Sequence, residues 1–247
     1  MALHVYGVVS AATQLPGTLR GRREAPVRLI VHSDLAAVVS DVEVDARIRR
    51  DDLLAHARVL ESLVEDSTVL PMRFGVIVET DEEVARNILE PGESGLTALL
   101  QYFDGLIQLT VKAHHDQNEA LKHLLRERPD LRLLRDETGE GPASYSAQLK
   151  LGEAIAAGLE ALVRSDAAML HDQLSGIAER IEFAEVTGQN QVLNAALLVR
   201  RSARNRTDEA VARLSRTLPD RLRIRYIGPQ PPYSFVDGEL TGDPVWA

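Results

Sequence analysis

The chain contains no cysteine, and this absence excludes several kinds of functional site. A thiol nucleophile, a disulfide framework and a cysteine-ligated zinc or iron–sulfur centre all depend on that residue. A chain without disulfides suits a reducing compartment, so we expect a cytoplasmic protein.

Long hydrophobic runs are absent as well. No stretch approaches the roughly 20 apolar residues that span a bilayer. The first ten residues, MALHVYGVVS, lack the basic flank and the apolar core of a secretory signal. We therefore expect a soluble protein that binds no membrane.

Positive charge is scarce. The chain has 28 lysine and arginine residues and 37 aspartate and glutamate residues, which gives a formal net charge of −9. General nucleic-acid binding needs an excess of basic side chains to neutralise phosphates, so we expect no nucleic-acid partner. One region departs from this balance and contains nine arginines: Arg200, Arg201, Arg204, Arg206, Arg213, Arg216, Arg221, Arg223 and Arg225. A solvated outer face is the simpler interpretation, and a surface for an anionic partner is the alternative.

The motifs of common enzymes are missing too. The chain has no Walker A loop, no H-E-x-x-H and no G-x-S-x-G, and the stretch 139–144 departs from G-x-G-x-x-G at its last position. His114, His115 and Asp116 resemble metal ligands, but neighbours on an extended chain point to opposite faces. We interpret them as the surface end of a strand. We predict no catalytic residue, no cofactor and no metal.

The first half of the chain has the patterns of short strands around one helix. We predict strands at 3–9, 27–31, 35–40 and 68–78, with a helix at 50–65 before the last of them. The predicted apolar stripe of that helix consists of Leu53, Ala57, Leu60 and Val64. Two more helices are predicted at 81–91, capped by Asp81, and at 94–103.

The second half begins with a clearly alternating strand. We predict, in order, a strand at 106–113, helices at 117–128, 130–136 and 144–175, a hairpin of 181–186 and 192–200, a helix from 205 and a strand at 221–226. In the first of these strands we expect Gln108, Thr110 and Lys112 on a solvated face. In the long helix we expect Leu149 on the apolar stripe and Asp166 on the polar side.

This order of elements predicts an α+β fold of two domains with a tail. Residues 1–104 would form a modified ferredoxin-like domain that has lost its first crossover helix. Residues 105–227 would form a ferredoxin-like domain, β-α-β-β-α-β, whose first crossover is enlarged by long helices. Residues 228–247 would form an extended tail, rich in proline and aromatic residues, that docks on the body of the protein.

Two stretches are unusual. The first is V-L-P-M-R-F-G at 69–75, where a proline interrupts an apolar strand, so we expect this strand at a sheet edge or with a bulge. Its Arg73 would face outward or pair with a carboxylate such as Glu61. The second is G-P-Q-P-P-Y-S-F at 228–235, a polyproline-like segment that ends in aromatic side chains. With Trp246 close behind, this tail carries much apolar surface and should dock on its own chain or, alternatively, in a partner's groove.

Together these stretches resemble the gas vesicle protein F/L family. The likeness rests on the helix D-D-L-L-A-H-A-R-V-L-E at 51–61, on V-L-P-M-R-F-G and on the terminal G-P-x-P-P-Y-S-F, and it runs from the strand at 5–7 to Phe235. It does not separate the F branch from the L branch. The resemblance implies a cytoplasmic assembly factor or minor vesicle component without catalysis. Its implied partners are the small hydrophobic shell protein of the gas vesicle and other gas vesicle accessory proteins.

By motif match the signature residues, which are our candidates for partner binding, are His56, Glu61, Pro71, Arg73, Phe74, Gly75, Pro231, Pro232, Tyr233 and Phe235. The strand that ends at Phe74 would offer a sheet edge to the shell protein. The competing interpretations are an enzyme and a small-ligand regulatory module, each with a site around His56, Glu61 and Arg73. Either would require a deep polar pocket at these three residues.

Overall fold

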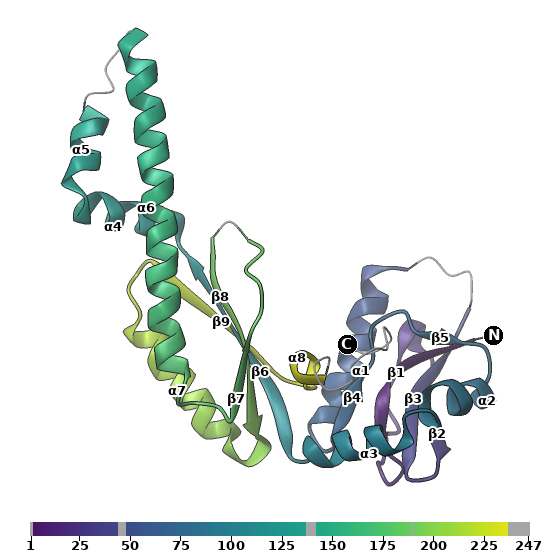
Figure 1. Cartoon of the computed structure of the whole chain (residues 1–247). Coiled ribbons are helices and arrows are strands. Elements are labelled where there is room, and N and C mark those ends of the chain that lie inside the picture. Colours follow the sequence, from purple (N-terminus) through teal and green to yellow (C-terminus); the bar gives the residue numbers. More distant parts are fainter. Residues whose placement is uncertain (1, 44–47, 137–141, 189, 237–247) are drawn as a thin grey trace. The chain divides into compact units, whose positions relative to one another are not determined.

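The structure is a computed structural model that describes the chain except for residues 1, 44–47, 137–141, 189 and 237–247 (Figure 1). The chain divides into two compact units. Unit 1 contains the described residues of 1–109, 198–204 and 227–236. Unit 2 contains the described residues of 110–197 and 205–226.

Unit 1 is built on an antiparallel sheet. Its strands are β1 (Ala2–Ser10), β2 (Val27–His32), β3 (Leu35–Val42), β4 (Val69–Pro71) and β5 (Ile77–Val78). They are arranged in the order β2-β3-β1-β4, and β5 pairs with β1 farther along the same side as β4 (Figure 1). The central strand β1 is buried from Ala2 to Val9, because it has neighbours on both sides and is covered on its faces. The strand predicted at 68–78 is thus two short edge strands separated by residues 72–76.

The helical elements of unit 1 are η1 (Arg22–Glu24), α1 (Arg50–Val64), α2 (Asp81–Val84), the π-helical turn η2 (Ala85–Leu89) and α3 (Glu93–Tyr102). Helix α2 begins at Asp81 as predicted, but its cap is Thr80, whose hydroxyl oxygen accepts the N–H of Glu83. Asp81 instead accepts two hydrogen bonds, of 2.7 and 2.8 Å, from Arg28 on β2. The predicted cap is wrong because a charged partner from another strand takes the carboxylate.

The buried face of α1 agrees only in part with the prediction, since Leu60 and Val64 are buried as predicted. Leu53, expected in the core, is 47% exposed. The buried residues are Asp52, His56, Val59, Leu60, Leu63 and Val64. A count of apolar residues cannot find this face, because two of its members are polar and depend on partners elsewhere in unit 1.

The second sheet contains β6 (Leu106–His115), β7 (Arg180–Phe183), β8 (Gln191–Arg200) and β9 (Leu222–Gln230) in the order β7-β8-β6-β9. The boundary between the units falls within β6, β8 and β9. The remaining helical elements are α4 (Gln117–Glu127), α5 (Pro129–Asp136), α6 (Pro142–Leu174), η3 (Arg201–Ala203), α7 (Arg204–Thr217) and α8 (Tyr233–Val236). The two sheets share one strand order. In each, the second strand along the chain lies at one edge and is followed by the third, the first and the fourth. The mixture of helices and sheets confirms the predicted α+β class, and the finer ferredoxin-like assignment stays a prediction.

The alternation in β6 does not produce the solvated face that we predicted. Gln108 and Thr110 are only 4% and 8% exposed. The side-chain oxygen of Gln108 accepts the N–H of Ser234 at 2.9 Å, so this polar group is buried with a partner. The prediction is wrong because a segment more than a hundred residues later covers this end of the strand.

A buried ion cluster links three segments of unit 2. His115, expected at the surface, and Asp166, expected on the polar side of α6, have side chains 5% and 3% exposed and lie 2.8 Å apart. Arg221 donates two hydrogen bonds, of 2.6 and 2.8 Å, to the same carboxylate. Burial acts to raise the pKa of Asp166, but the hydrogen bonds from His115 and Arg221 outweigh it and lower that pKa. Both predictions are wrong because each charge is buried with its partners.

The C-terminal segment differs from the predicted polyproline-like tail. Strand β9 continues to Gln230, and one helical turn, α8, follows. Gly228 has a φ of +142°, and a Cβ there would lie 3.1 Å from the Gln108 carbonyl oxygen, so glycine suits this position. Trp246, residues 137–141 and residue 189, which lies between the two strands of the predicted hairpin, are outside the described residues. Within the described part of the chain, no helix combines the length and the apolar character that a membrane span requires.

Candidate functional site

A bulge in the central strand of unit 1 turns one tyrosine inward. The register between β1 and β3 shifts at Tyr6, which has no partner in that pairing. Its carbonyl oxygen accepts the N–H of Met72 at 2.9 Å. Its hydroxyl bonds to Ser40 at 2.8 Å and accepts the N–H of Arg22 at 2.9 Å. One buried side chain thus joins β1, β3 and the segment that contains η1.

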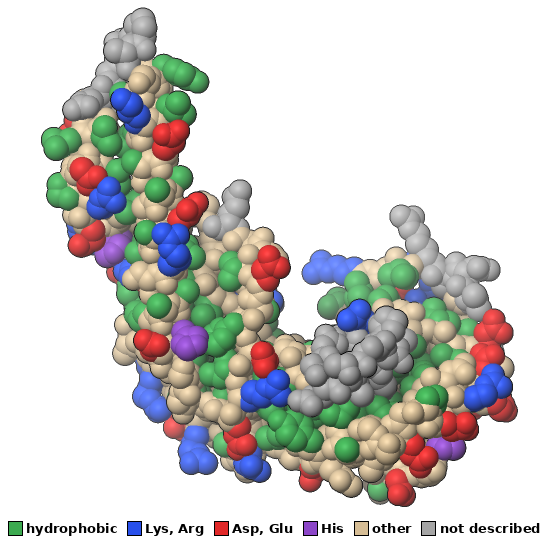
Figure 2. Space-filling model, in the orientation of Figure 1, with side chains coloured by type: hydrophobic (Ala, Val, Ile, Leu, Met, Phe, Trp, Pro, Cys, Tyr) green, Lys and Arg blue, Asp and Glu red, His purple; other side chains and the backbone are tan. Residues whose placement is uncertain are grey.

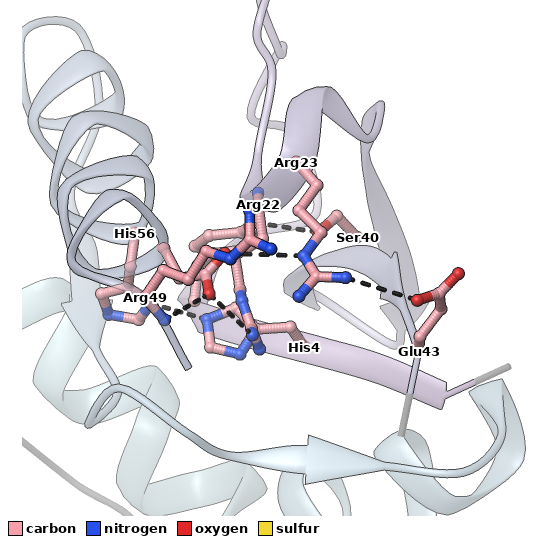
Figure 3. Close-up of polar contacts among 9 residues, drawn as sticks. His4, Arg22, Arg23, Ser40, Glu43, Arg49 and His56 are labelled. Atoms are coloured by element: carbon pink, nitrogen blue, oxygen red, sulfur yellow. Dashed lines mark hydrogen bonds and ion pairs between the residues drawn. The ribbon is translucent and has the colours of Figure 1, made fainter. Parts of the chain in front are cut away.

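Two histidines beside this tyrosine form a directed chain of hydrogen bonds (Figure 3). His56 Nε2 lies 3.1 Å from the Met72 carbonyl oxygen, which can only accept, so this nitrogen carries the proton. His56 Nδ1 then accepts from His4 Nε2 at 2.9 Å. This leaves His4 Nδ1 unprotonated, and it has no hydrogen-bond partner among the described residues. Both rings are neutral in this arrangement.

The surroundings of the two rings keep them neutral. The pKa of His4 is lowered to about 3, chiefly by burial and in part by the neighbouring His56 and Arg22. Burial also lowers the pKa of His56 to about 4, against the opposing hydrogen bond to Met72. Since both side chains are buried and uncharged at neutral pH, they act as packing and hydrogen-bonding groups and not as a solvent-accessible acid or base.

A buried ion pair lies next to the histidines. Arg22 is 2% exposed, and its Nη2 lies 3.4 Å from Asp52 Oδ2. Asp52 also accepts the backbone N–H of Arg49 at 2.9 Å, at the start of α1. Burial acts to raise the pKa of Asp52, but the hydrogen bonds from Arg49 and Arg22 outweigh it and lower that pKa. The carboxylate therefore stays ionised, and it fixes the start of α1 to η1.

Phe74 closes this cluster toward the solvent. Its ring centroid lies 5.3 Å from that of His4 and 5.7 Å from that of His56, and the Arg22 guanidinium carbon lies 5.3 Å from it. Gly75 follows with a φ of +100°, a conformation that favours glycine and turns the chain into β5. The motif at 69–75 is therefore an edge strand with a turn that folds one aromatic ring over the buried polar groups.

The C-terminal signature packs on the N-terminal one. Helix α8 contacts β4, and Phe235 is fully buried there. Pro71, Pro231 and Pro232 are buried as well. Burial raises the pKa of the Tyr233 hydroxyl, and the nearby Glu61 carboxylate raises it further. Two motifs about 160 residues apart in the printed sequence thus meet within unit 1.

The three residues of the predicted alternative site differ in their exposure to solvent. His56 is buried, whereas Glu61 and Arg73 are exposed. Three cavities in the described part of the chain have volumes of about 1070, 310 and 330 Å³. His56, Glu61 and Arg73 are absent from the lining of all three cavities. The geometry therefore gives no support to an enzyme or ligand site at these residues.

The structure adds polar residues that sequence reasoning missed, namely His4, Tyr6, Arg22 and Asp52. A signal for one pair was present, since Asp52 and His56 are four residues apart and share a face of α1. No local pattern connects them to Arg22 or His4, which come from other segments.

Several arginines of the basic region have partners within the protein. Arg201 donates to the carbonyl oxygens of Val64 and Ser67, each at 3.1 Å. Arg204 lies 3.1 Å from a Glu65 carboxylate oxygen, and Arg221 belongs to the ion cluster of unit 2. These arginines stabilise helix ends and a buried carboxylate, while binding of an anionic partner by the others stays a prediction.

Comparison with known proteins agrees with the resemblance noted in the sequence. Residues 2–237 match the family model of the gas vesicle synthesis protein GvpL/GvpF. The chain is 34% identical over 243 residues to gas vesicle protein F of a Streptomyces species, covering 96% of this chain and 100% of that protein. It is 25% identical over 236 residues to gas vesicle protein F of Dolichospermum flosaquae, covering 94% and 96%. The crystal structure of the gas vesicle protein GvpF from Anabaena sp. is similar, with a TM-score of 0.78, 25% identity and coverage of 95% and 97%.

Proposed function

Because the chain belongs to the gas vesicle synthesis protein GvpL/GvpF family and so has a role related to gas vesicles, we propose that it binds the small hydrophobic shell protein during vesicle assembly. It would act in the cytoplasm as an accessory or minor structural protein, together with other gas vesicle proteins. We propose no catalytic role, and the relatives reported above carry the names of gas vesicle proteins.

The observation that carries this proposal is an apolar surface on the helical hairpin α5–α6 of unit 2. Leu133 on α5 is 66% exposed, and Tyr145 and Leu149 on α6 are 73% and 55% exposed. Tyr145 and Leu149 are one helical turn apart and therefore share a stripe. The two helices contact each other, and Leu131 of α5 is fully buried. Figure 2 shows hydrophobic side chains exposed among the charged ones over this hairpin.

A single exposed leucine is ordinary, but several large apolar side chains on adjoining helices mark an interaction surface. Leu149 was expected on the apolar stripe of this helix, and its exposure leaves apolar area for a partner. A shell subunit that exposes apolar surface before it joins the vesicle would bury that surface here, since removal of apolar area from water favours association. An apolar stripe on a helix is a common recognition element for such contacts.

The signature residues divide into two groups under this proposal. His56, Pro71, Pro231, Pro232 and Phe235 are buried and hold unit 1 together. The more exposed members, Glu61, Arg73, Gly75 and in part Phe74 and Tyr233, would form a second contact surface for a gas vesicle protein. The edge strand β4 is buried beside α8, so we place the main shell contact on the hairpin instead.

The proposal is tested by co-purification with the shell protein. We expect the wild-type chain to retain it, and a Leu133→Asp/Leu149→Asp variant to lose at least most of the bound shell protein. Leu53→Asp, at an exposed leucine on helix α1 of unit 1, is the matched control and should bind like the wild type. Arg73→Ala tests the second surface separately. Equal binding by the hairpin variant and the control, with both folded by circular dichroism, would contradict the proposed surface.

A further inference from the structure

We propose that two copies of this chain associate through β7, which pairs edge to edge with β7 of the second copy about a twofold axis. Strand β7 ends the order β7-β8-β6-β9, and no described strand pairs with its outer side. An edge of this kind offers backbone N–H and C=O groups that another strand can bind. Isologous pairing about a twofold axis is the commonest form of self-association.

The hydrogen bonds to β8 show which backbone groups of β7 point outward. The N–H of Ala184 donates to the carbonyl oxygen of Asn194 on β8 at 2.9 Å. Successive residues of an antiparallel strand direct their backbone groups to opposite sides. Arg180 and Glu182 therefore face β8, and Ile181 and Phe183 face outward. A second strand would bond at these two residues.

The charges on β7 select one register for self-pairing. The strand reads R-I-E-F, and Arg180 Nε lies 3.0 Å from Glu182 Oε1, so the two charges share a face. If the two strands pair about Ile181, each Arg180 lies opposite Glu182 of the second copy. These would be positions without backbone hydrogen bonds between the copies, where side chains approach most closely. Opposite charges in such cross-strand pairs stabilise a sheet.

The neighbouring register is disfavoured by the same charges. Pairing about Glu182 would place the two Glu182 carboxylates opposite each other, and like charges in that position destabilise. In the register centred on Ile181, the charges of two β7 strands are therefore complementary. In the same register the outward N–H and C=O groups of Ile181 can bond to the second copy. This charge complementarity identifies a second copy of the chain as the occupant of the edge.

Exposed apolar side chains lie along the same edge. Phe183 and Val186 are 43% and 41% exposed, and they line a groove of about 330 Å³ that Ala167, Ala168 and His171 of α6 also line. The His171 ring stacks on Phe183 with centroids 4.8 Å apart. Pairing of the two edges would bring the Ile181 side chains together on the face opposite the charges and cover part of this apolar surface.

Charge reversal tests the pairing, with association measured by sedimentation velocity over a range of concentrations. We expect the wild-type chain to dimerise reversibly and Glu182→Arg to raise the dissociation constant about tenfold or more, because two attractive pairs become repulsive. The double variant Arg180→Glu/Glu182→Arg restores both pairs and should return to within about threefold of the wild type. A wild-type chain that is monomeric at every concentration overturns the proposal, as does a dimer that the single reversal leaves unchanged.

Cysteine substitution tests the register, since every cross-link must come from the residue introduced into a cysteine-free chain. Ile181→Cys places the two thiols on directly opposite residues, roughly 5.5 Å apart at Cα, within disulfide range. Phe183→Cys places them roughly 14 Å apart, four residues out of step. We expect rapid oxidation to a linked dimer only for Ile181→Cys. Equal cross-linking of both variants, or of neither in a chain that sediments as a dimer, refutes the register.

Discussion

The buried histidine pair should make the stability of unit 1 depend on pH between 8 and 5. The pKa values of His4 and His56 in the folded protein are about 3 and about 4, below the ordinary value of 6.5. Because the folded pKa lies below the unfolded one, acid protonates the unfolded chain first and favours unfolding. The effect is absent above about pH 6.5 and grows as the pH falls toward the folded pKa.

The magnitude follows from the distance between pH 5 and the ordinary histidine pKa, about 1.5 units, which corresponds to about 2 kcal/mol for each ring. The pair should therefore lower the free energy of unfolding by about 4 kcal/mol between pH 8 and pH 5. That is a large part of the roughly 5–15 kcal/mol by which domains of this kind are stable.

The perturbation that isolates this effect is His56→Gln. A glutamine side chain can donate to the Met72 carbonyl and accept from His4, so the hydrogen bonds can persist while one titrating group is removed. Urea unfolding followed by circular dichroism at pH 8 and pH 5 gives the loss of stability for each protein. We expect His56→Gln to lose about 2 kcal/mol less than the wild type. Equal losses in the two proteins would refute the neutral, buried pair.

Three further substitutions test the packing inside each unit, and the effect of each is measured by urea unfolding of the full chain. Asp166→Asn removes the carboxylate shared by His115 and Arg221 and should destabilise by about 3–5 kcal/mol, and a loss below about 1 kcal/mol would show that the cluster is dispensable. Phe235→Ala empties a fully buried site and should cost about 3–5 kcal/mol, whereas a near-neutral result would mean that α8 does not pack on β4. Gly75→Ala forces a side chain into a positive-φ turn and should cost about 1 kcal/mol, and a stabilised variant would contradict that backbone conformation.

The order of strands and helices could be predicted because each element carries its own local pattern. The alternation of β6 and the apolar spacing of α6 are both visible within a single stretch of sequence. The two signature motifs could be found in the same way, since a proline in an apolar strand and a proline-aromatic segment are unusual by themselves. Their meeting at β4 and α8 could not be predicted, because nothing local relates residues so far apart.

The buried polar groups mark the limit of that reasoning. His4 and His56 are 52 residues apart, and His115 and Asp166 are 51 apart. Periodicity places a polar residue on the outside by default, and only a partner from another segment reverses that placement. For this reason Asp166 and His115 were both predicted at the surface, and Asp52 and His56 were not included in the predicted buried face of α1.

The most direct test of the proposed role is site-directed photo-cross-linking to the shell protein. A photoreactive phenylalanine analogue at Tyr145, on the apolar stripe of α6, is compared with the same analogue at Tyr102, an exposed tyrosine of unit 1. Our account predicts a covalent product with the shell protein from position 145 and none above background from position 102. Capture from position 102 alone, or from neither position while the proteins assemble into vesicles, would contradict it.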